Sequence, residues 1–266
     1  MQLTIPANLK TLIPLLVGLP ILMVQTHRKE ATKMSLFEPT AVKCPCCDQI
    51  VTVSAVGSVN ADRRPDYRDA VLNNSFQEFN CDACKETFRL QPMFNYLDVG
   101  RAQWIAAMPA DGFPNYLEAE DEVAALFATS YGAKSPEAAQ VIGRNLKVRL
   151  TFGWPAVREK ILAREHNIDD IALELMKLDL LRELPSAPLS VGVELRLLDV
   201  AEADMIFAWL KTEDEETLEM FGAPLGWYQA IANDLDAWSA VGAKLTDGPF
   251  VDMQKIYFGD GRQAAE

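Results

Sequence analysis

The chain has 266 residues, of which 49% are hydrophobic and 24% are charged. This composition excludes a disordered chain and a membrane-embedded one, and the length permits one large domain or two small ones. The formal net charge is −13, and it comes from residues 101–266, because residues 1–100 hold ten basic and ten acidic side chains. An acidic protein repels phosphate backbones, which makes nucleic acid an unfavourable partner and favours a solvated acidic surface.

An apolar segment over residues 12–24 lies ahead of a second methionine, Met34. It is shorter than the ~20 apolar residues that span a bilayer, and Pro14 and Pro20 disfavour a helix there. We therefore expect translation to begin at Met34 and residues 1–33 to be a doubtful leader or an over-extended N-terminus. A weak export or membrane segment is the alternative.

All five cysteines lie in two groups in the first third of the chain. The pairs Cys44/Cys47 and Cys81/Cys84 are both C-x-x-C and can supply four thiolates to one tetrahedral zinc ion, leaving no coordination position open for chemistry. The clustering and the odd number argue against a disulfide framework and indicate a reducing compartment, the cytoplasm. Cys46 lies between two ligands, and we expect its side chain to point away from the metal.

The sequence between the two cysteine pairs predicts a zinc ribbon that carries an insertion. Residues 49–56 alternate like a strand, residues 62–74 are typical of a short helix, and residues 75–81 return as a strand into the second pair.

After the second cysteine pair the sequence predicts a β-hairpin and then a domain boundary. Residues 87–97 and 101–109 predict a β-hairpin with Gly100 in its turn. A cluster of proline and glycine comes next. We expect a zinc-ribbon-like, β-rich domain over residues 34–112 and an acidic α+β region over residues 113–266.

The acidic region mixes helices and strands without regular βαβ alternation, which indicates the α+β class. Five carboxylates within residues 212–219 lack the glycine and the spacing of a calcium loop, so we expect a solvated loop or a first turn. The periodicity predicts helices over 115–132, 135–143, 155–167, 169–181 and 226–238, and strands over 147–153, 191–200, 204–212 and 250–258.

The stretch "KCPCCDQIVTVSAVGSVNADRRPDYRDAVLNNSFQEFNCDAC" resembles the CpXC-domain proteins, a bacterial and archaeal family. The likeness continues through "PMFNYLD" and "RLTFGWPAVREKILAREHNIDDIALELMKLDLL", so it covers about residues 42–185. The resemblance implies a zinc-bound fold and no particular activity. By position, the four family cysteines fall on Cys44, Cys47, Cys81 and Cys84.

One departure from such motifs concerns the residue after each cysteine pair. Glycine is common there because the backbone tends toward positive φ, whereas this chain has Asp48 and Lys85. Aspartate tolerates that conformation better than lysine does, so we expect the second turn to be strained or differently shaped.

A zinc-binding scaffold that presents a surface to another protein is the function we expect, with no catalytic residue assigned and the oligomeric state open. His166, the one histidine outside the leader, lies at a predicted helix end. A thiol-disulfide oxidoreductase using Cys44 and Cys47 is the first alternative, but that chemistry needs a helix after the first cysteine. A nucleic-acid-binding zinc ribbon is the second, although acidic residues interleave with the arginines at 63–68.

Overall fold

The computed structural model describes residues 37–184 and 187–259. The expectations for residues 1–33 and for Met34 lie outside these ranges. The described chain is mixed α+β, as expected from the sequence. None of its described helices has both the length and the apolar character needed to cross a bilayer.

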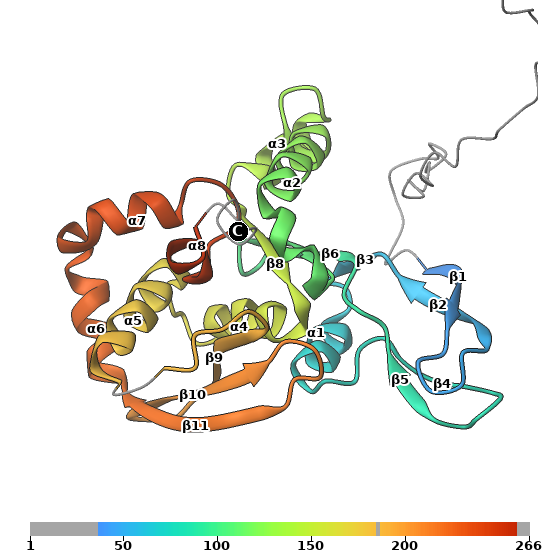
Figure 1. The fold of residues 1–266 in the computed structure, drawn as a ribbon. Coiled ribbons are helices and arrows are strands. Elements are labelled where there is room, and N and C mark those ends of the chain that lie inside the picture. Colours follow the sequence, from blue (N-terminus) through green and yellow to red (C-terminus); the bar gives the residue numbers. More distant parts are fainter. Residues whose placement is uncertain (1–36, 185–186, 260–266) are drawn as a thin grey trace, which may run out of the picture. The chain divides into compact units, whose positions relative to one another are not determined.

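The two cysteine pairs each occupy the turn of a small antiparallel hairpin. Strands β1 (Phe37–Lys43) and β2 (Ile50–Val56) form the first hairpin, and β4 (Glu78–Asn80) and β5 (Thr87–Arg89) form the second. The hairpins lie side by side (Figure 1). Helix α1 (Pro65–Leu72) is the insertion that the sequence predicts between them, whereas β1 was not predicted.

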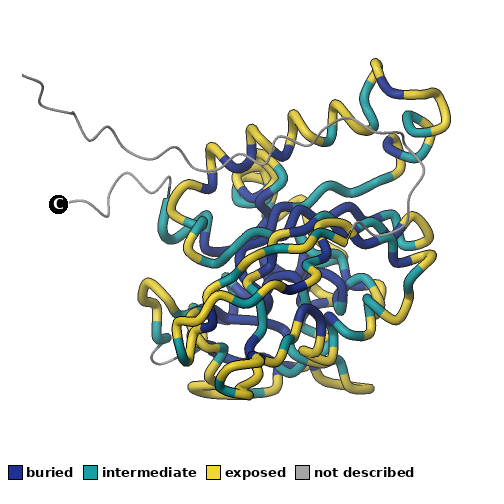
Figure 2. Tube along the Cα trace, turned by 90° about the vertical axis from the view of Figure 1, so that its right-hand side faces the viewer, coloured by how far each residue is buried: buried dark blue, intermediate teal, exposed yellow. Residues whose placement is uncertain are grey.

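A four-stranded sheet follows, in the order β3-β6-β7-β8. The outer pairs β3–β6 and β7–β8 are parallel, and β6–β7 is the predicted antiparallel hairpin. Helices α1 and α4 cover one face and α2 covers the other; Figure 2 shows that buried residues gather in this interior. The bounds are β3 Ser58–Asn60, β6 Phe94–Asp98, β7 Gln103–Met108, β8 Lys147–Phe152, α2 Tyr116–Tyr131 and α4 Gly153–Glu165.

The turn between β6 and β7 is held by a residue that precedes α1. The carboxylate of Asp62 accepts hydrogen bonds from the backbone N–H groups of Val99 (2.7 Å) and Gly100 (2.9 Å). A Cβ on Gly100 would lie 3.0 Å from that carboxylate, so a larger residue would require the Asp62 side chain to shift by a few tenths of an ångström. The left-handed residue of the turn is Ala102, with φ of 54°.

The second part of the described chain is a three-stranded antiparallel sheet, in the order β11-β10-β9, with helices packed on one face (Figure 1). Strand β11 contains the end of the acidic run 212–219, which the sequence analysis expected to be a loop or a first turn. The bounds are β9 Val193–Val200, β10 Asp204–Lys211, β11 Thr217–Pro224, η1 Ala110–Asn115, α3 Glu137–Gly143, α5 Asp170–Glu183, α6 Leu225–Asn233, η2 Leu235–Trp238 and α7 Ser239–Leu245.

The strand predicted over residues 250–258 is wrong: the segment is irregular and ends in the short helix α8 (Gln254–Tyr257). Its backbone groups bond to buried side chains instead of to a neighbouring strand. Phe250 N–H donates to Glu120 (2.9 Å), Met253 N–H donates to Glu174 (3.0 Å), and the Val251 carbonyl accepts from Lys160 (2.6 Å). These three polar side chains satisfy the groups that a sheet ladder would have used.

Buried ion pairs join α4, α5, β9 and the segment that follows residue 249. The ammonium of Lys177, on α5, lies 2.6 Å from Glu159 of α4 and 3.0 Å from Glu174. The guanidinium of Arg196, on β9, lies 3.1 Å from Glu159 and 2.6 Å from Asp252. All five side chains are almost fully buried, so each charge depends on its partners instead of on water.

We expect Lys177→Met to destabilise the protein strongly, because it leaves Glu159 and Glu174 facing each other in the interior without their shared cation. The free energy of unfolding should fall by about 3–5 kcal/mol, measured by urea denaturation. Arg182→Met on the same helix is the control, because Arg182 makes an exposed ion pair with Asp179 and should cost under about 1 kcal/mol. Equal losses in the two variants would refute a stabilising role for the buried pairs.

Candidate metal centre

The sulfur atoms of the two C-x-x-C pairs come together where the hairpins meet. All four Sγ atoms lie within 4.8 Å of one another. The separation between Cys44 Sγ and Cys84 Sγ is 3.8 Å, and that between Cys47 Sγ and Cys81 Sγ is 3.7 Å. Four sulfurs at ~2.3 Å from a tetrahedral ion would be ~3.8 Å apart, so the arrangement is compatible with one four-coordinate metal ion.

The two cysteine turns have the same backbone geometry. The N–H of Asp48 donates to the carbonyl of Cys44 (3.0 Å), and the N–H of Lys85 donates to the carbonyl of Cys81 (2.8 Å). Asp48 has a φ of 60° and Lys85 a φ of 66°, so both take the left-handed conformation that glycine favours. The second turn is therefore shaped like the first, and each accepts a conformational cost of about 1–2 kcal/mol.

The sulfur cluster is partly shielded from solvent. Cys44 and Cys81 are fully buried, whereas Cys47 and Cys84 are half-buried. Apolar side chains of the hairpin strands surround them and form a small core separate from the three others: Val42, Val51, Val53, Phe79, Phe88 and Leu90. This core is small for four short strands.

The thiols of Cys81 and Cys47 have pKa values shifted in opposite directions. The backbone N–H of Cys84 hydrogen-bonds to the sulfur of Cys81 and lowers the pKa of that thiol to about 7. At Cys47 the backbone of Gln49 acts to lower the pKa, but burial and hydrogen bonds with neighbouring thiols raise it to about 12. Four adjacent thiolates repel one another, so a cation at their centre is what would allow all of them to ionise together.

His166 lies at a helix end, as expected, and Cys46 is not one of the four clustered cysteines. The side chain of Cys46 is exposed and stands outside the sulfur cluster. His166 is exposed at the C-terminal end of α4, where its backbone N–H bonds to Leu162.

Arg64, Arg68 and part of the acidic run 212–219 take part in ion pairs. Arg64 pairs with Asp66 at 2.6 Å, and its guanidinium lies 3.6 Å from the ring centroid of Tyr67. Within the acidic run, Glu215 bonds to Arg158 of α4 at 2.6 Å and to Arg89 of β5. It thus links the second cysteine hairpin to the rest of the fold, a role that its sequence context did not indicate.

The fold and the site define an α+β protein with a four-cysteine cluster at the tips of two hairpins. A family model described as CpXC protein matches residues 42–177, slightly more than half of the chain. The chain belongs to the CpXC protein family. No curated protein and no solved structure matches it.

We expect replacement of a cluster cysteine, but not of Cys46, to release the metal. Loss of groups that merely orient metal ligands already weakens binding by about 10–100-fold, so Cys47→Ser and Cys84→Ser should each weaken binding of added metal ion at least that much. Cys46→Ser is the matched control and should keep one ion per chain, measured by native mass spectrometry with a competing chelator. Metal loss in Cys46→Ser, or full retention in Cys47→Ser, would contradict this ligand set.

We expect a chelator to loosen the two hairpins before the rest of the fold. Without an ion at the four sulfurs, β1, β2, β4 and β5 would be held only by their small apolar core and by a few contacts with the rest of the fold, such as Arg89 with Glu215. Hydrogen exchange should accelerate at the amides of these strands, while β7 and β10, which lie in the larger cores, stay protected. Uniform acceleration across the chain, or no change in the hairpins, would show that the cysteine centre does not hold them.

Proposed function

We propose that this protein is a zinc-stabilised scaffold that uses its cysteine-bearing end to bind another protein. The observation that carries the proposal is the closed cluster of four sulfurs at the tips of two hairpins. Thiolate ligands in a tetrahedral set suit zinc, and two hairpins joined tip to tip are the arrangement of a zinc ribbon. With four protein ligands the ion keeps no position for a substrate, which supports a structural role over a catalytic one.

The surface beside the sulfur cluster supports protein binding. Ile50, the first residue of β2, is 76% exposed, although it lies only three positions after Cys47. Nearby, a groove of about 560 Å³ runs between residues 49–54 and residues 79–83. An extended segment of a partner could lie in this groove along a strand edge, and Ile50 would be buried on contact.

The two rival functions receive less support from the hairpin geometry. In a thiol oxidoreductase of this motif a helix follows the first cysteine and stabilises its thiolate, whereas here β2 follows Cys47. For nucleic-acid binding, Arg64 and Arg68 near α1 are paired with carboxylates, which reduces the positive charge available to neutralise phosphates. The free cysteines of the described chain support placement in the reducing cytoplasm.

We expect a partner to be captured from position 50 and not from a comparable exposed apolar position elsewhere. A photo-crosslinking amino acid at Ile50 should give one discrete crosslinked product in the native host. Val141, on α3, is 48% exposed and is the matched control. The product should disappear when Cys47 and Cys84 are both replaced by serine, because the hairpins then lose their shared ion.

Identical products from both positions, or no product from position 50, would contradict the proposed surface. A crosslinked product that persists after the double serine replacement would show that partner binding does not depend on the metal centre.

A further inference from the structure

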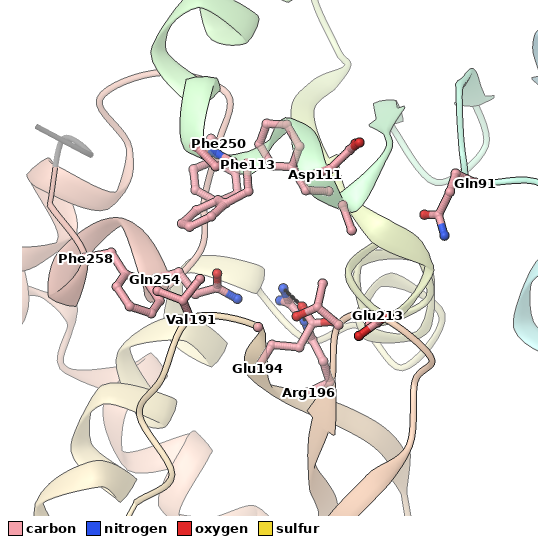
Figure 3. Close-up of a pocket in the computed structure, with 15 residues that line it drawn as sticks. Gln91, Asp111, Phe113, Val191, Glu194, Arg196, Glu213, Phe250, Gln254 and Phe258 are labelled. Atoms are coloured by element: carbon pink, nitrogen blue, oxygen red, sulfur yellow. Dashed lines mark hydrogen bonds and ion pairs between the residues drawn. The ribbon is translucent and has the colours of Figure 1, made fainter. Parts of the chain in front are cut away.

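A cavity of about 430 Å³ lies away from the cysteine centre, between η1, the start of β9, the turn after β10 and the segment that includes α8. This volume falls within the range of small-molecule sites. Figure 3 shows Glu194 and Arg196 on β9, with their side chains directed toward the rings of Phe113 and Phe250. The cavity therefore has an aromatic side and a charged side.

The aromatic side is formed by rings that already pack on one another. The ring centroid of Phe113 lies 6.0 Å from that of Phe152, 5.8 Å from that of Phe250 and 5.9 Å from that of Phe258. Phe152 and Phe250 are almost fully buried. Because these rings come from η1, β8 and the segment over residues 250–258 and hold one another in place, the wall exists before any ligand arrives.

The charged side contains a carboxylate oxygen without a partner. Glu194 is 1% exposed, and its Oε2 accepts from Arg196 Nε (2.9 Å) and from the Arg196 terminal nitrogen (2.6 Å). Its Oε1 has no hydrogen-bond partner among the described residues. A buried carboxylate oxygen loses water without recovering a bond, which costs free energy unless a donor reaches it.

The positive charge of Arg196 is not available to bind an anion in the cavity. Its guanidinium is shared among the carboxylates of Glu194, Glu159 and Asp252. The other charged residues that line the cavity are both acidic, Asp111 and Glu213. The field inside the cavity is consequently negative, and it favours a positively charged ligand.

We propose that this cavity binds a small organic cation, an amine or amidine attached to an aromatic body, whose N–H donates to Glu194 Oε1. The four phenylalanines contact the apolar part, and their ring faces attract a neighbouring positive charge. Burial raises the pKa of the Glu194 carboxyl, the charge of Arg196 lowers it, and the charges of Asp252 and Glu159 raise it further. A cationic ligand relieves that unfavourable concentration of negative charge.

Benzylamine is the probe for this site, with benzyl alcohol and benzoate as its neutral and anionic counterparts. A fragment of this size binds with a Kd of about 1 mM at ordinary ligand efficiency, so ligand-observed NMR on the full chain is suitable. We expect benzylamine to bind about tenfold more tightly than benzyl alcohol, and benzoate not to bind. Equal binding of the amine and the alcohol, or no amine binding at about 10 mM, would overturn the proposal.

Two variants locate the probe in the cavity. Glu194→Gln should reduce benzylamine affinity about tenfold and leave benzyl alcohol unchanged, whereas Phe113→Ala should weaken both. Glu219→Gln, an exposed carboxylate on β11, is the control and should change neither. If Glu194→Gln unfolds the protein, Phe113→Ala decides alone: undiminished benzylamine binding in that variant refutes the site.

Discussion

The buried carboxylate of Glu159 is the constraint on which the central packing of this fold depends. One of its oxygens is within 2.6 Å of Lys177 and 3.1 Å of Arg196, and the other accepts the backbone N–H of Leu197 at 2.6 Å. Helix α4, helix α5 and strand β9 are therefore fixed by a single side chain. Because α4 also covers the four-stranded sheet, this carboxylate sets the position of the three-stranded sheet relative to the four-stranded one. An apolar residue of the same size would pack but would not specify this register.

The cysteine centre is stabilised differently. Its two turns place Asp48 and Lys85 in left-handed backbone conformations, and its apolar core is small. Metal binding free energy is therefore the term that can offset the cost of the turns, if the proposed zinc ion is present. The larger cores of the fold rely instead on apolar packing and on ion pairs among their buried side chains. Two independent sources of stability in one chain are consistent with the proposed scaffold, whose cysteine-bearing end would fold fully only with a metal bound.

The cysteine centre and most of the element order could be predicted from the sequence, because both follow from local rules. Two C-x-x-C pairs with strand-like flanks predict two hairpin turns that bring four sulfurs together. Apolar periodicity predicts helices α2 and α5, and Asp169, whose side chain caps α5, marks the start of α5. The division at residue 112 stays a prediction. The four-stranded sheet takes β8 from beyond that position, a pairing that is set by tertiary contacts and has no local signal.

The buried ions could not be predicted, because in sequence they look like the solvated face of a helix. Glu159 and Lys160 stand side by side in "PAVREKILAREHN", and Glu174 and Lys177 have the i, i+3 spacing of a surface pair. The same cause explains the wrong strand over residues 250–258. Its apolar residues are compatible with a strand, but its hydrogen-bond partners are charged side chains that sequence patterns place on the surface.

The buried ions also revise the expectation that the acidic residues lie on a solvated surface. Among the described residues, more acidic than basic side chains are buried, so part of the negative charge that the sequence places on the surface lies inside the protein. The six buried acidic residues are Asp98, Glu120, Glu159, Glu174, Glu194 and Asp252, and the three buried basic residues are Lys160, Lys177 and Arg196. An interior excess of carboxylate persists only where hydrogen bonds or a neighbouring cation compensate it. At Glu120, Glu159, Glu174 and Asp252, contacts with ammonium, guanidinium or backbone N–H groups compensate the negative charge.

At Glu194 this compensation is incomplete, because one carboxylate oxygen has no hydrogen-bond partner, and Glu194 lines the aromatic cavity. The local charge imbalance and the vacant volume therefore coincide, and an external cation would correct both at once.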